Sequence, residues 1–86
     1  MAGVEEIRAG IALANEKASA GIAALQQAAQ SLEEAQQSLV QATQGSSQQE
    51  VSQAHGLLAQ ALHDISGLQS TIQASISAAD SYSARL

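Results

Sequence analysis

Two histidines, His55 and His63, are the residues most suited to metal chemistry in this sequence of 86 residues. Zinc sites use histidine, cysteine and carboxylate side chains that converge on one point. The two histidines are eight positions apart, which places them roughly 80° apart around a helix with 3.6 residues per turn. Glu50 and Asp64 are near in sequence, but no third ligand converges with the histidines. We therefore expect no metal site and assign both histidines to an exposed polar face.

Acid–base and nucleophilic catalysis find equally little support. Glu33 and Glu34 are adjacent, and adjacent helical residues point about 100° apart, so we expect two solvated carboxylates rather than a catalytic pair. The serines have neither a base beside them nor a strand–turn–helix elbow to expose one. The chain has no cysteine, which excludes a disulfide, a thiol nucleophile and thiolate metal ligands. The sequence predicts no enzyme, no catalytic residue and no cofactor.

Charge and composition narrow the class of partner. The net charge is −5, with three Lys and Arg residues in total, too few for a stripe that tracks phosphates. Binding to nucleic acid or to anionic lipid is therefore not expected. The longest apolar run is far short of the roughly 20 residues of a membrane span, and the first residues lack a basic stretch followed by an apolar block. We expect synthesis in the cytoplasm, no membrane insertion, and any export by a route without a signal peptide.

The strongest pattern is a repeat of seven residues over positions 25–45, which reads LQQAAQS, LEEAQQS and LVQATQG. Leucine occupies the first position of each heptad and alanine the fourth. Apolar residues at these two positions are typical of a coiled coil, because they keep one stripe of each helix facing a partner. The same phase extends back to Val4 and predicts one helix over about 4–43. The absence of proline agrees with long helices.

A turn is predicted at 44–47. Gly45 suits the left-handed conformation that ends many helices, and Ser47 with Glu50 forms a capping-box match just before the next helix. The second helix is expected over about 48–85. A short connection between two helices of similar length makes them antiparallel. The predicted fold is therefore all-α: a single helical hairpin spanning 1–86 with coiled-coil-like heptad packing.

The first and fourth heptad positions supply the predicted contact between the two helices. The larger residues assigned to this contact are Val4, Ile7, Ile11, Leu25, Leu32, Leu39, Val51, Leu58, Ile65, Leu68, Ile72 and Tyr82. Folding the chain about its turn places Tyr82 opposite Gly10, so that large residues meet small ones. With alanine or glycine at most fourth positions of the first helix, the two axes should approach closely.

Other large apolar residues lie off this stripe and predict a second, intermolecular face. They are Leu13, Ile22, Leu57, Leu62 and Ile76. Ordering a residue costs about 1–2 kcal/mol, whereas a fully buried large aliphatic side chain contributes only about 1.5–3 kcal/mol. A lone hairpin shields its contact from one direction only, so association should supply the missing burial. We expect a homodimer that forms a four-helix bundle, or a pair with a similar hairpin.

Glycines inside both predicted helices leave two interpretations open. They come in pairs eleven residues apart, Gly10 with Gly21 and Gly56 with Gly67. Eleven residues are close to three helical turns, so each pair forms a smooth track on which another helix could dock. The alternative is that long helices tolerate some glycine, at about 1 kcal/mol each relative to alanine.

The overall architecture resembles the Trp-X-Gly (ESX) helical-hairpin family of type VII secretion proteins and the related hairpins that accompany bacterial polymorphic toxins. Thr43-Gln44-Gly45 stands where that family has Trp-X-Gly, keeping the glycine and lacking the tryptophan. The family's export signal places an acidic residue four positions after a tyrosine near the C-terminus. Here Leu86 stands four positions after Tyr82, and Asp80 precedes it. The resemblance implies a bacterial helical-hairpin dimer that acts as a partner, adaptor or chaperone of a larger secreted or toxin protein.

Together these patterns predict a non-enzymatic, dimeric protein–protein interaction module, and the resemblance implies that it is associated with secretion or with a toxin. The alternative is a structural coiled-coil scaffold or filament element in which heptads stack end to end. A pair of helices lying on a lipid surface is a third hypothesis, which the shortage of Lys and Arg opposes.

Overall fold

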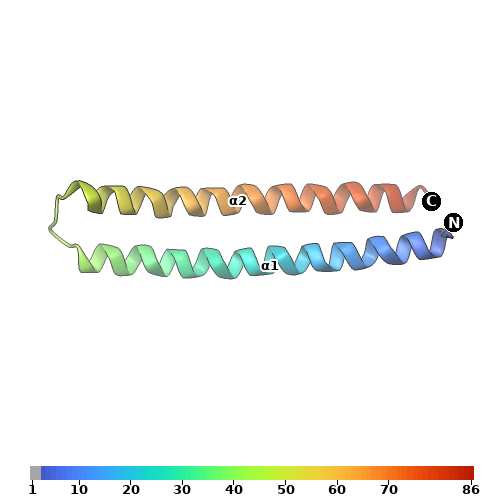
Figure 1. Ribbon diagram of the computed structural model, residues 1–86, viewed down its shortest axis with the longest axis horizontal. Coiled ribbons are helices and arrows are strands. Elements are labelled where there is room, and N and C mark those ends of the chain that lie inside the picture. The colour runs from blue at the N-terminus through green and yellow to red at the C-terminus, as the bar shows by residue number, and fades with distance from the viewer. Residues whose placement is uncertain (1–2) are drawn as a thin grey trace.

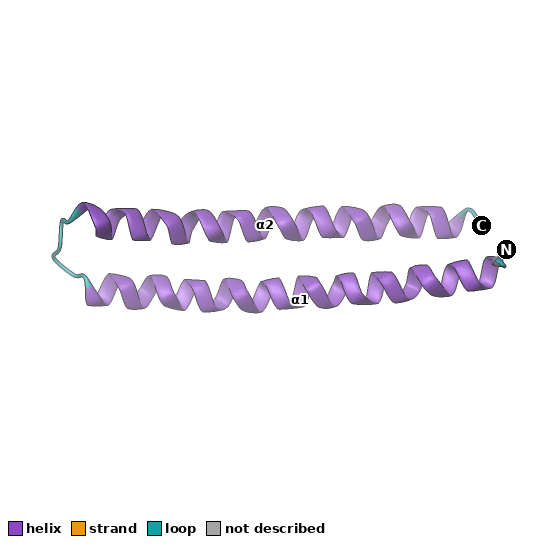
Figure 2. Cartoon of the chain, in the orientation of Figure 1, coloured by secondary structure: helices purple, strands orange, loops and turns teal. Residues whose placement is uncertain are grey.

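The computed structural model describes residues 3–86 and contains two long helices (Figure 1). Helix α1 spans Val4–Ala42 and helix α2 spans Gln49–Ala84. The chain reverses between them, so the helices lie side by side in opposite directions, and the described residues form no strand (Figure 2). The predicted all-α antiparallel hairpin is confirmed at this level. Met1 and Ala2, which the predicted domain includes, lie outside the described residues.

The turn has the predicted glycine conformation but not the predicted cap. Gly45 has φ of +82°, a left-handed backbone that side chains with a Cβ disfavour. The backbone N–H of Ser46 donates to the carbonyl oxygen of Thr43 at 3.0 Å and closes the turn. The capping box of Ser47 and Glu50 is not formed, because α2 begins at Gln49 and its N-cap residue is Gln48, which makes no side-chain cap hydrogen bond.

The first turn of α1 is stabilised by charge rather than by a side-chain cap. Its N-cap residue is Gly3, which has no side chain to donate or accept. Glu5 and Glu6 lie in the first turn, where negative charge interacts favourably with the helix dipole. Arg8 Nη1 lies 3.8 Å from Glu5 Oε1, a pair one helical turn apart that adds a few tenths of a kcal/mol at such an exposed site.

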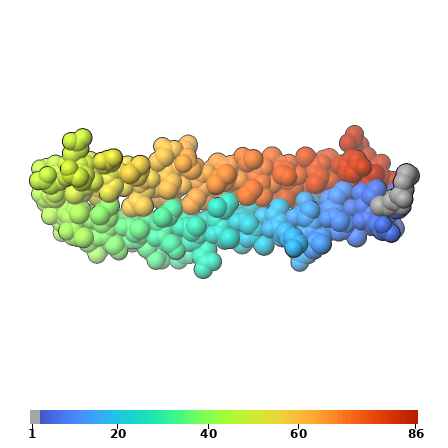
Figure 3. Space-filling view, in the orientation of Figure 1, coloured from blue at the N-terminus to red at the C-terminus, as the bar shows by residue number. Residues whose placement is uncertain are grey.

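The hairpin is a rod that lacks a core of its own. Its extents are 64 × 17 × 15 Å and its radius of gyration is 19.4 Å, against about 12 Å for a compact domain of this length. No residue within 3–86 is fully buried. The accessible surface is 6181 Å² for 8.7 kDa, whereas a compact monomer of this mass exposes about 4,700 Å². In Figure 3 the two helices lie side by side, and atoms of both are visible along the length of the rod.

Candidate functional site

The contact between the helices follows the first and fifth heptad positions. Four half-buried residues lie at fourth heptad positions: Ile7, Gly21, Ala54 and Ala61. The other half-buried residues recur at alternating spacings of four and three, as one stripe facing one partner requires. We call this set the seam. On α1 and just after it the seam contains Ile11, Asn15, Ala18, Ile22, Leu25, Ala29, Leu32, Gln36, Leu39 and Thr43. On α2 and just after it the seam contains Val51, His55, Leu58, Leu62, Ile65, Gln69, Ile72, Ile76, Ala79, Ser83 and Leu86.

The predicted contact used the fourth positions in place of the fifth, and this half of the prediction differs from the burial pattern. Leu68 is 51% exposed and Tyr82 is 47% exposed, although both were assigned between the helices. Val4, at the end of the rod, is 43% exposed, and Ile7 is half-buried. Replacing the fourth position by the fifth turns the facing stripe by about 50° on each helix. The predicted first-position residues from Ile11 to Ile72 remain in the seam.

This rotation also divides the predicted intermolecular face. Ile22, Leu62 and Ile76 are half-buried in the seam instead of lying outside it. Leu13 and Leu57 are 53% and 63% exposed. Leu13 lies on the back of α1, whereas Leu57 follows Ala54 by three residues and precedes Ala61 by four, so it lies beside the fourth positions of α2. The five residues therefore do not form one surface. The fifth positions carry Ile22, Leu62 and Ile76, and the fourth positions carry Ile7, Leu68 and Tyr82, so the number of large side chains does not by itself choose between the two stripes.

The seam accepts polar residues where their ends can reach water or a partner. Asn15 Nδ2 donates to Asp80 Oδ1 at 2.8 Å, which links the two helices near their open end. Arg8 Nε donates to the backbone carbonyl oxygen of Ser83 at 3.4 Å in the same region. These two contacts fix the pairing of the helices to within a few residues of the predicted folding point. Tyr82, however, points away from the seam with nearly half its surface exposed.

The fourth heptad positions form one continuous surface beside the seam, which we call the apolar side. Equal heptad positions of two antiparallel helices lie on the same side of the pair, because a two-fold axis perpendicular to the rod relates the helices. The apolar side consists of Ile7, Ala14, Gly21, Ala28, Ala35 and Ala42 of α1 with Ala54, Ala61, Leu68, Ser75 and Tyr82 of α2. It carries no charged residue, and most of its α1 members are exposed.

The second heptad positions form the opposite surface, which we call the polar side. It consists of Glu5, Ala12, Ser19, Gln26, Glu33 and Val40 of α1 with Ser52, Ala59, Ser66, Gln73 and Asp80 of α2. The hydrogen bond between Asn15 and Asp80 lies on this side. On each helix, the positions of either side lie about 80° around the helix axis from the middle of the seam. The hairpin therefore has an apolar side and an opposite polar side, in addition to the half-buried seam between its helices.

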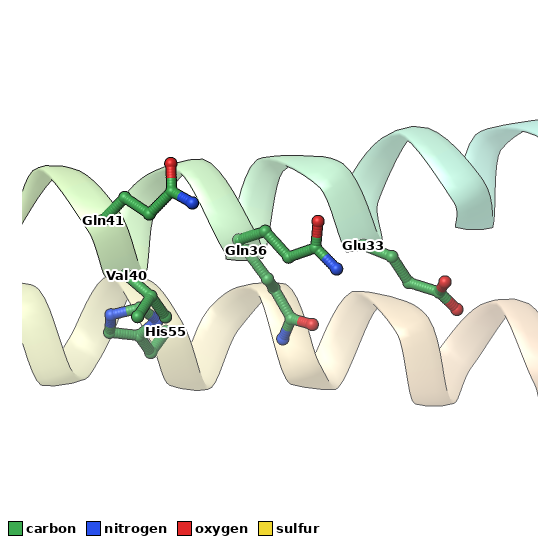
Figure 4. A pocket seen from close by; sticks show the side chains of 6 residues that line it. Glu33, Gln36, Val40, Gln41 and His55 are labelled. Atoms are coloured by element: carbon green, nitrogen blue, oxygen red, sulfur yellow. The ribbon is translucent and has the colours of Figure 1, made fainter.

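A shallow groove of about 590 Å³ lies on the polar side near the turn. Glu33, Gln36, Gln37, Val40 and Gln41 of α1 line it together with His55 of α2 (Figure 4). Its lining has one carboxylate and one imidazole, with amides between them. Mixed polar and apolar lining in an open groove gives a small molecule little enclosure.

The structure places the two histidines differently from each other. His55 is half-buried in the seam, where the sequence predicted exposure, and His63 is exposed. Among residues 3–86, no three His, Asp or Glu side chains gather closely enough to hold a metal ion. Neither helix, as far as the chain is described, has the length of apolar sequence that crossing a bilayer requires.

Sequence reasoning missed the apolar side, although the signal for it was present. The alanines at the fourth positions recur with the same period as the leucines at the first positions, so each helix carries an apolar stripe that extends from the seam onto one side. A stripe of that width is typical of a helix that contacts more than one neighbour. Comparisons with known proteins find no family model, no curated protein and no solved structure that matches this chain.

Proposed function

We propose that this chain is a non-enzymatic interaction module that reaches a stable fold by packing one surface of its hairpin against another helical protein surface. The observation that carries the proposal is the lack of any fully buried residue within 3–86. The rod exposes about 1,400 Å² more than a compact monomer of its mass would. An interface of ordinary size covers about 800 Å² per partner, so one docking event removes much of this excess.

The surfaces of the hairpin support binding rather than catalysis. The groove is open and shallow, and its single imidazole and single carboxylate come without a nucleophile. By contrast, the apolar side runs the full length of both helices. Long apolar stripes laid against other helices are a recurring mode of protein recognition.

We extend the proposal to the role that the resemblance to the ESX hairpins implies: a partner or adaptor of a larger secreted or toxin protein of a bacterium. Two features support it. The two helices are nearly equal in length, and Gly45 forms the turn between them in a left-handed conformation.

Circular dichroism and sedimentation equilibrium on the same samples test the main proposal. We expect helicity and association to rise together as protein concentration increases from the submicromolar range, because burial in the interface stabilises the helices. A monomer that stays fully helical and unfolds cooperatively at every concentration would contradict the proposal.

One observation favours a second candidate, an open-ended scaffold. Leu13 is large and 53% exposed on the back of α1, away from the apolar side. Contacts through two different surfaces generate filaments rather than closed pairs. The same sedimentation experiment separates the two: a limiting mass supports the module, and mass that grows without limit supports the scaffold.

A further inference from the structure

We infer that the apolar side is an interface between two copies of this chain, which pair through it into a four-helix bundle. This inference rests on the proposed function and specifies both the surface and the partner. The argument starts from the asymmetry between the two sides of the hairpin. The polar side carries the charges of Glu5, Glu33 and Asp80, whereas the apolar side carries none.

The size of the apolar side matches what a stable pair needs. The rod measures 64 Å by 17 Å in outline, so one side presents roughly 1,000 Å², against about 800 Å² per partner in an interface of standard size. The rod is thin in the remaining direction, at 15 Å. Two such layers placed together give the two-layer thickness on which helical domains build a buried core.

The absence of charge favours a second copy over a charged partner. Each copy has a net charge of −5, and an interface that placed these carboxylates face to face would be strongly repulsive. Pairing through the apolar side keeps the acidic residues of the polar sides on opposite outer surfaces of the dimer. A partner recognised through basic residues would find no matching carboxylate on this side.

Side-chain sizes make the apolar side complementary to itself. From Ala14 to Ala42, the α1 half has only alanine and glycine, whereas the α2 half carries Leu68 and Tyr82. A two-fold axis along the rod lays α1 of one copy on α2 of the other, as an isologous interface requires. Each large residue then packs against the small residues of its partner, and both become covered. Leu68 and Tyr82, now about half exposed, gain the burial that their own hairpin does not provide.

A matched pair of substitutions tests this assignment in the full chain. Ala35→Lys places a charge on the apolar side, and Ala59→Lys places the same charge on the polar side. Both alanines are exposed in the hairpin. They lie at the same height on the rod, eight residues before Thr43 and eight residues after Val51. In a single hairpin both substitutions place a charge at an exposed site of the same height, so a loss of association that only Ala35→Lys causes reports the second copy.

Sedimentation equilibrium should show a dimer for the unsubstituted chain and for Ala59→Lys. Ala35→Lys should dissociate on the order of 100-fold more readily, because the pairing would bury an unpaired ammonium group. A dimer unaffected by Ala35→Lys, or broken by Ala59→Lys, overturns the choice of surface and leaves the proposed function standing. If the unsubstituted chain is monomeric and mostly unfolded, the inference that its partner is a second copy is wrong. A stable, fully helical monomer overturns both.

Discussion

Asn15 of α1 donates a hydrogen bond from Nδ2 to Oδ1 of Asp80 of α2 at 2.8 Å, across 65 positions of sequence. This side-chain contact joins the open end of the hairpin, opposite the turn, and fixes the height at which the two helices pair. Asn15 occupies a fifth heptad position and Asp80 a second position, so the bond also locates the edge of the seam on the polar side. Asn15 therefore has the same heptad position as Ile22, so the seam contains an amide in one heptad and an aliphatic side chain in the next.

A double-mutant cycle measures the strength of this bond. Asn15→Ala, Asp80→Ala and the double variant should give a coupling free energy of about 0.5–1 kcal/mol in urea unfolding, because the bond is exposed and exchanges with water. A cycle between Asn15→Ala and Asp64→Ala is the control, since Asp64 bonds within its own helix to Gln60. Its coupling should be close to zero. Equal coupling in the two cycles would show that the bond does not form in solution.

The turn and the helices predict opposite effects of adding a methyl group to glycine. Gly45→Ala should lower the free energy of unfolding by about 1 kcal/mol, because φ is +82° there and a Cβ disfavours that backbone. Gly67→Ala should raise it by about 1 kcal/mol, because alanine is the better helix former and an added Cβ meets no atom within 4 Å in the hairpin. Thermal unfolding at one protein concentration compares them. A stabilising Gly45→Ala would contradict the observed turn.

The sequence predicted the helices and the turn. It combined the first heptad positions with the fourth positions, whereas the burial pattern combines them with the fifth positions. Leucine at the first position recurs so regularly that the phase of the repeat was evident. The second member of the pair was ambiguous, since Ala28 at a fourth position and Ala29 at a fifth position are equally apolar. The large residues do not separate the alternatives either, because Ile22, Leu62 and Ile76 lie at fifth positions and Ile7, Leu68 and Tyr82 lie at fourth positions.

Polar residues at the fifth positions make this half of the seam hard to recognise from the sequence. Gln36 and His55 occupy fifth positions and are half-buried, although a strict apolar pattern assigns such residues to the surface. Their long or planar side chains place carbon atoms against the neighbouring helix and leave the polar end near water. The predicted cap at Ser47 is not formed for a local reason: the sequence motif fits, but α2 begins at Gln49, one residue too late for Ser47 to be its N-cap.

Truncation of aliphatic side chains distinguishes the seam from the exposed surface of the helices. Ile22→Ala should lower the free energy of unfolding by about 1–2 kcal/mol, less than for a fully buried isoleucine, because the residue is only half-buried. Leu57→Ala should change it by less than about 0.5 kcal/mol, since that leucine is 63% exposed. Urea unfolding followed by circular dichroism, at one protein concentration, provides both values. If Leu57→Ala lowered the free energy of unfolding more than Ile22→Ala, Ile22 would have to lie outside the seam.

The two histidines provide a final test of the seam, because one lies in it and the other does not. His55→Leu should raise the free energy of unfolding by roughly 1 kcal/mol, since leucine buries more apolar surface at a half-buried position. His63→Leu changes the same residue type eight positions further along the same helix, at an exposed site. It should leave the stability within about 0.5 kcal/mol of the unsubstituted chain. Thermal and urea unfolding in the same buffer and at one protein concentration provide both values. Equal stabilisation by the two substitutions would mean that leucine acts through helix propensity alone, and His55 would then have to lie outside the contact between α1 and α2.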